Sequence, residues 1–240
     1  MASVCACGEY FNVNKEGELC LNRSTMGLRD VVRFTSAGTY QFERGDYPWL
    51  ARVRVMVQAA GGGSGGADSD PNQAIFRPGG AGGGHSESLL DVKALGAVET
   101  VVVGRGGPGG RGNNPGVAGG NSSFGGLVVA TGGDGGSATM ESATFLTTTS
   151  GIAGPTGTIG QIAAGGGAGE GAIRLSGTSG RAGAGGDSRL GNGGYGRATH
   201  GPGTTTRGFG GGAGGAVSIN GDAMPGEDGG VGCVIIELYG

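Results

Sequence analysis

Three cysteines near the N-terminus have a spacing that suits a metal ion. Cys5 and Cys7 are separated by one residue, and Cys20 follows further along the same polar segment. A structural zinc site takes four thiolate or imidazole ligands, so this set is one ligand short, with Cys233 or a histidine as the fourth. The sequence therefore leaves three alternatives open: a zinc site, a disulfide formed after release from the cell, or reduced thiols.

A glycine-rich tract resembles a nucleotide-binding loop in its spacing alone. Gly104 to Gly109 fits G-x-G-x-x-G and follows an apolar run. In a dinucleotide-binding fold that loop opens a helix, whose N-terminus faces the pyrophosphate. The next residues, Gly110 to Pro115, are unsuited to a helix. We interpret the tract as structural and predict no cofactor there.

The residues suited to acid–base or nucleophilic catalysis form no recognisable set. His85 lies beside Ser86 and Glu87, and His200 lies beside glycine, without the G-x-S-x-G context of a nucleophile. The 19 acidic residues are scattered and show no paired spacing. Carboxylates from distant segments can still form a glycosidase pair. The sequence predicts that the protein is not an enzyme, with an envelope-degrading hydrolase as the less favoured alternative.

Loops that interrupt the glycine tracts are the best candidates for binding. These loops span residues 68–78, 140–162 and 194–209. The third combines aromatic, cationic and hydroxyl side chains, a mixture that suits a saccharide or cell-wall contact. Its candidate contact residues are Tyr195, Arg197, His200, Arg207 and Phe209. The alternative is that these loops are solvated tips or contacts between subunits.

Glycine dominates the elements that must position these residues. The chain has 63 glycines in 240 residues, and all but five lie after residue 60. Collagen requires glycine at every third position with abundant proline, which this chain lacks. The composition instead indicates packed, extended segments of the polyproline II type, with three residues per turn. Such segments have no internal hydrogen bonds, so their backbone groups are free to bond neighbouring segments.

Alternating apolar residues predict a small β-core. The clearest strand covers residues 52–57, where valines and arginines alternate. Further strands are predicted over 31–35, 39–42, 86–92, 98–103 and 121–131. The last strand, 233–239, is expected to pair with 53–57. No segment has a sustained helical period, so almost no α-helix is expected.

The predicted fold is mostly β, with two parts along the chain. Residues 1–29 form a small Cys-containing N-terminal head, and residues 30–240 form a glycine-rich β domain. Within that domain, a small antiparallel β-sandwich core is built from about 30–60, 86–131 and 231–240. A glycine-rich lobe of polyglycine II segments is expected as an insertion over 132–230.

Five stretches of the sequence together resemble a known family. They read ARVRVMVQAAGGGSGG, PGGAGGGHSESLLDV, VETVVVGRGGPGG, GGNSSFGGLVVATGGDGG and GEDGGVGCVIIELYG. In this order they resemble the glycine-rich domain of bacteriophage minor tail proteins, especially in phages of actinobacteria, over roughly residues 30–240. The resemblance implies a virion component at the tail tip or on a fibre, often a homotrimer, that contributes to contact with the host surface.

Charge and hydropathy narrow the range of partners. The net charge is −3 and basic residues are scattered singly, so we expect no nucleic acid partner. No apolar stretch is long enough for membrane insertion, and the N-terminus lacks the pattern of a signal peptide. We therefore expect assembly in a host cytoplasm into a virion tail, with other tail proteins and a bacterial cell-surface glycan as partners. A purely structural tail or baseplate protein without receptor contact is the main alternative.

Overall fold

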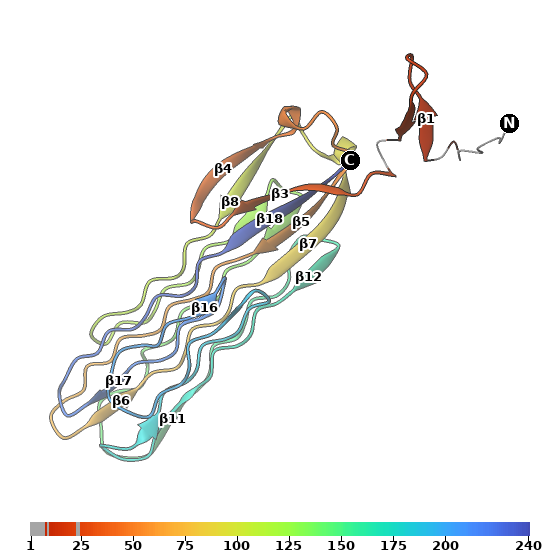
Figure 1. Ribbon diagram of the computed structural model, residues 1–240. Helices are drawn as coiled ribbons and strands as arrows, with labels where there is room; N and C mark the ends of the chain where they lie inside the picture. The colour runs from red at the N-terminus through yellow and green to blue at the C-terminus, as the bar shows by residue number, and fades with distance from the viewer. Residues whose placement is uncertain (1–7, 9, 23–24) are drawn as a thin grey trace.

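The computed structural model describes residues 8, 10–22 and 25–240. Its body is elongated, with a β-sandwich at one end and a long lobe of extended, wavy segments at the other (Figure 1). The C-terminus lies at the sandwich end, and β6 and β11 lie near the far end of the lobe. The strands are β1 (Phe11–Val13), β2 (Leu19–Leu21), β3 (Leu28–Phe34), β4 (Gly38–Glu43), β5 (Arg52–Gln58), β6 (Ala74–Phe76), β7 (His85–Asp91), β8 (Val98–Val103), β9 (Ser122–Phe124), β10 (Val128–Ala130), β11 (Thr147–Thr149), β12 (Ile162–Ala164), β13 (Ala172–Arg174), β14 (Gly180–Arg181), β15 (Gly191–Asn192), β16 (Arg207–Gly208), β17 (Val217–Ile219) and β18 (Cys233–Tyr239).

The larger sheet has five antiparallel strands in the order β12-β7-β5-β18-β3. The C-terminal strand β18 lies between β5 and β3, with Ile236 opposite Val55. The predicted pairing of residues 233–239 with 53–57 is therefore confirmed. Because both strands alternate, one face of this sheet is apolar and the other carries charged side chains.

A second sheet, in the order β10-β9-β8-β4, covers the apolar face of the first. Val53, Val55 and Ile236 of the larger sheet belong to the same buried cluster as Phe42 and Phe124 of the smaller one. An aromatic contact also joins the two sheets, because the ring centroids of Phe34 on β3 and Tyr40 on β4 are 5.0 Å apart. The predicted small antiparallel sandwich is confirmed.

The other regular elements are short. They are the pairs β1–β2, β15–β16 and β17–β6, the three-stranded sheet β11-β13-β14, and two 3-10 turns, η2 (Arg44–Asp46) and η3 (Val92–Ala94). The described residues contain no α-helix, as predicted. None of their helical segments has the length and hydropathy to span a membrane.

Hydrogen bonds from residues 60–67 show how the lobe is built. Every third amide of this segment donates to the same neighbouring segment, at 2.9–3.1 Å. Ala60 donates to Gly120, Gly63 to Val117 and Gly66 to Asn114. Gly61 donates to Gly230, Ser64 to Glu227 and Ala67 to Met224. This three-residue period is that of a polyproline II-like helix, as the glycine content predicted.

The same central segment is bonded on all sides. Gly62 donates to Ala81, which adds a third neighbouring segment as acceptor. Its carbonyls accept amides from three more segments, because Gly133 donates to Ala60, Gly107 to Gly61 and Ala213 to Gly62. Residues 60–66 are therefore surrounded by six extended segments, and most of their backbone groups bond within the protein.

Glycine is required because the segments approach backbone to backbone. A Cβ built on Gly62 would lie 2.1 Å from the carbonyl oxygen of Asp134, and one on Gly80 would lie 2.3 Å from that of Gly62. Both glycines are buried. This part of the lobe thus has a core made of hydrogen-bonded backbone. Two small clusters of buried apolar side chains, one around Phe76 and one around Ile75, add to it.

The lobe extends beyond the segment predicted as an insertion. Residues 59–84 and 104–120 also run through it, and 60–66 form its centre. In the other direction, β12 comes from the predicted insertion yet adds a strand to the larger sheet of the sandwich. Both differences have the same cause, which is hydrogen bonding between distant segments. Glycine runs that leave different strands bond one another in the lobe, and β12 bonds to β7 in the sheet. The division at residue 30 between head and domain stays a prediction.

Candidate functional site

Two of the five predicted contact residues share one hollow. Tyr195 and Arg207 line a depression of about 230 Å³ together with Asn192, Gly193 and Thr205. Tyr195 is 61% exposed. An aromatic ring, a guanidinium and a hydroxyl therefore face solvent side by side, in the combination that the sequence suggested.

The other three predicted residues make separate local contacts. His200 accepts a hydrogen bond from the amide of Ile219 through Nδ1, at 3.1 Å. The guanidinium of Arg197 lies beside Gly201, and its buried Nε has no hydrogen-bond partner in the described part of the chain. Phe209 donates its amide to the carbonyl of Leu190. A receptor contact at the five residues stays a prediction.

The predicted zinc site falls partly outside the described residues, where Cys5 and Cys7 lie. Cys20 is a free, half-buried thiol on β2. Cys233 is buried in the sandwich, and burial raises the pKa of its thiol to about 11, which disfavours the thiolate that binds zinc. No cluster of three or more metal-ligating side chains occurs in residues 8, 10–22 and 25–240. Zinc at the head stays a hypothesis, which elemental analysis of purified protein would test.

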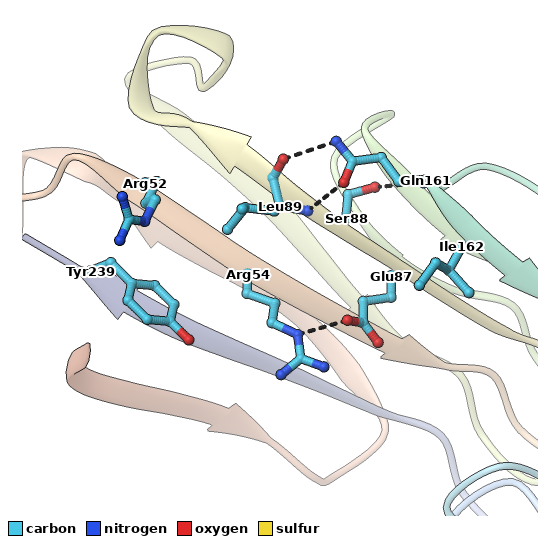
Figure 2. Close-up of a pocket in the computed structure, with 8 residues that line it drawn as sticks. All are labelled: Arg52, Arg54, Glu87, Ser88, Leu89, Gln161, Ile162 and Tyr239. Atoms are coloured by element: carbon cyan, nitrogen blue, oxygen red, sulfur yellow. Dashed lines mark hydrogen bonds and ion pairs between the residues drawn. The ribbon is translucent and has the colours of Figure 1, made fainter. Parts of the chain in front are cut away.

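The charged face of the larger sheet carries a groove of about 400 Å³ (Figure 2). Arg54 projects from β5 between two carboxylates, with Nε 2.6 Å from Glu87 and Nη1 3.4 Å from Glu237. The hydroxyl of Tyr239 donates to Glu237 at 2.8 Å. Arg52 lies over the ring of Tyr239, 5.3 Å from its centroid.

The ion pair with Arg54 sets the charge of Glu87 in this groove. The hydrogen bond from Arg54 is the main cause that holds the pKa of Glu87 below its usual range. Glu87 is therefore ionised at neutral pH and pairs with the cationic Arg54. The groove offers a fixed ion-pair network flanked by exposed Leu89 and Ile162.

A third hollow, of about 500 Å³, is lined by β11, which lies near the far end of the lobe in Figure 1. Its walls are formed by residues 139–143, by Phe145 and by residues 147–150, and we call it the tip groove. Arg174 of β13 is 1% exposed and lies against it. The loop over 140–162 had been a predicted binding loop, but no sequence pattern indicated a buried arginine beneath it.

Comparison with known families decides the classification. A family model described as a glycine-rich domain matches residues 35–239, which are 205 of the 240 residues and include nearly all of the sandwich and lobe. The protein belongs to this glycine-rich domain family. No curated protein matches the sequence.

Within this glycine-rich domain, His85 lies where the sandwich meets the lobe and was not a predicted site residue. It is 2% exposed, and neither ring nitrogen has a hydrogen-bond partner in the part of the chain that the structure describes. Its Nε2 is 3.8 Å from Glu87. Burial, followed by the charge of Arg189, lowers the pKa of His85, while Glu87 opposes the shift. The imidazole is therefore held neutral.

Acid should destabilise the protein through His85. The folded-state pKa lies below the ordinary value of 6.5, so the unfolded chain binds the proton more tightly. The free energy of unfolding should be constant above about pH 6.5 and fall below it by up to about 1.4 kcal/mol per pH unit. Urea unfolding at pH 7, 6 and 5 measures this. The variant His85→Phe should lose the slope, and an unchanged slope would contradict the assignment.

Proposed function

We propose that the protein is a structural component of a phage tail tip or fibre, and that its lobe contributes to host-cell surface recognition and attachment. The observation that carries the proposal is the hydrogen-bonded array around residues 60–66. An array bonded on six sides is a stiff body, unlike a loop of the same composition. Stiffness is what a part exposed at the end of a virion requires.

The placement of the binding loops supports the same proposal. The sandwich carries the C-terminus at one end, and β11, which lines the tip groove, lies toward the other end (Figure 1). A domain attached through its sandwich would hold the lobe loops away from the particle. Loops on a rigid scaffold vary at little cost to stability, which suits recognition of a bacterial cell-surface glycan.

Two measurements test this proposal. Antibodies raised against the purified chain should label the tails of virions from the source of the gene under the electron microscope. Fluorescent protein should label host cells and, in excess, should slow adsorption of the phage. Unlabelled tails would refute a tail location. Labelled tails without any cell binding would favour the purely structural tail or baseplate protein.

A homotrimer is part of the proposal, with other tail proteins as neighbours. Exposed apolar side chains on the lobe, such as Val117 and Leu175, are compatible with contacts between copies. Sedimentation equilibrium at micromolar concentration should give three times the chain mass, and a stable monomer would count against the trimer. The hydrolase alternative predicts release of reducing sugar from host envelopes.

A further inference from the structure

The tip groove has a preformed wall. The buried guanidinium of Arg174 donates from Nε to the carbonyl of Phe145 at 2.9 Å, and from Nη1 to the carbonyl of Glu141 at 2.6 Å. Its Nη2 donates to the hydroxyl of Thr147 at 2.9 Å. One rigid side chain thus fixes both walls, so little conformational entropy remains to be lost when a ligand binds.

An aromatic ring stands open beside this wall. Phe145 is 68% exposed although the guanidinium carbon of Arg174 lies 5.2 Å from its ring centroid. An exposed phenylalanine on a fixed backbone presents a flat apolar surface of defined orientation. Its neighbour Leu146 is 65% exposed but does not line the groove. The two residues are thus a matched pair for experiment.

Short hydroxyl side chains provide the polar part of the groove. Six of the lining residues are serine or threonine: Thr139, Ser142, Thr147, Thr148, Thr149 and Ser150. No side-chain hydrogen bond from Thr148 or Ser150 to a described residue is found, and both residues are exposed, so their hydroxyl groups are open to a ligand. The groove therefore combines one apolar platform with several hydroxyl groups.

The charges in the groove disfavour anions. Arg174 is its only cationic lining residue, and four N–H groups of this guanidinium already donate to protein acceptors. Glu141 adds a carboxylate to the lining. A phosphate or uronate would therefore meet a negative group and few free donors. A neutral ligand with hydroxyl groups and an apolar face matches better.

We propose that the tip groove binds a neutral pyranose unit, with the C–H face of the sugar on the ring of Phe145 and its hydroxyl groups bonded to Thr148 and Ser150. The inference rests on the proposed function for its biological setting, since it names the ligand class of the host contact. A volume of about 500 Å³ accommodates one or two sugar rings.

The test uses the purified full chain on an array of neutral hexose and N-acetylhexosamine oligosaccharides, with uronate- and phosphate-bearing ones alongside. The best neutral oligosaccharide is then titrated by calorimetry. Phe145→Ala should weaken binding about tenfold, the scale of an aromatic contact, and Thr148→Ala with Ser150→Ala by a similar factor. The control Leu146→Ala should stay within about twofold of the unaltered protein.

The outcomes separate this inference from the proposed function. The tip groove is not a saccharide site if the protein retains no neutral oligosaccharide on the array. The same conclusion follows if Phe145→Ala and Leu146→Ala bind the oligosaccharide equally well. Preference for charged oligosaccharides would overturn the neutral ligand class. If cells are labelled equally well by Phe145→Ala, host contact stands and resides elsewhere. If sugars bind through Phe145 but virion tails are unlabelled, the groove stands and the tail location falls.

Discussion

Replacing Gly62 by alanine should cost the protein about 4 kcal/mol of unfolding free energy or more, or prevent folding. The added Cβ would lie 2.1 Å from the carbonyl oxygen of Asp134. This neighbour is backbone within a hydrogen-bonded segment, so it cannot rotate away as a side chain would. Separating the segments would also strain the bonds of Gly62 to Ala81 and Ala213.

The Gly62→Ala variant tests the close approach of the segments without the effect of an unusual backbone conformation. Gly62 does not have a positive φ, so alanine is free to adopt its backbone geometry. The matched control is Gly45→Ala, where a Cβ would meet nothing within 4 Å. Thermal unfolding should show a midpoint lowered by about 10 °C or more for Gly62→Ala and nearly unchanged for Gly45→Ala. Equal midpoints would refute a lobe held together by its backbone.

The sandwich could be predicted because its side chains carry the pattern. Val53, Val55 and Val57 alternate with Arg52, Arg54 and Met56, and the apolar run of β18 supplies the strand that pairs with them. Alternation with period two fixes which face is buried. These two strands, and their pairing, were therefore accessible from the sequence.

The neighbours within the lobe could not be predicted, because glycine tracts carry almost no side-chain information. Nothing in residues 104–110 or 210–216 indicates which of them lies beside Gly62. The information lies partly in rare alanines, such as Ala81, which is buried at a place where the array has room for a methyl group. A prediction based on composition gives the type of packing and leaves its order open.

The candidate sites divide in the same way. Tyr195 and Arg207 are near in sequence and were found together, because the β15–β16 pair folds that stretch onto itself. Arg77 and Arg174 were missed. Arginine is seldom fully buried, and nothing in their local sequence distinguishes them from the solvent-exposed arginines. Only the structure shows that both lie beneath the loop that forms the tip groove.

Arg77→Met should lower the unfolding free energy by about 2–5 kcal/mol. The guanidinium of Arg77 is fully buried and donates to the carbonyls of Gly66 at 2.7 Å and Met140 at 2.8 Å, and to Asn113 Oδ1 at 2.7 Å. No ion pair to a carboxylate is found for it among the described residues. Methionine fills similar space but leaves two buried carbonyls without a donor.

The buried charge of Arg77 itself opposes folding. It therefore reduces the loss of unfolding free energy expected for Arg77→Met. Burial lowers the pKa of its guanidinium to about 10, so it is still charged at neutral pH and its desolvation opposes folding. Removing that charge recovers part of the loss from the orphaned carbonyls. We expect the carbonyls to dominate, because Gly66 belongs to the central segment and Met140 to the wall of the tip groove.

The control for Arg77→Met is Arg181→Met, since the side chain of Arg181 is 59% exposed in its ion pair with Glu170. Its loss should change the unfolding free energy by less than about 1 kcal/mol. Calorimetry gives the two midpoints, and limited proteolysis gives the location of the damage. Cleavage within residues 138–147 should appear in Arg77→Met alone, because only that variant releases the carbonyl of Met140. If Arg77→Met keeps the normal midpoint and resists cleavage there, this arginine does not support the tip groove.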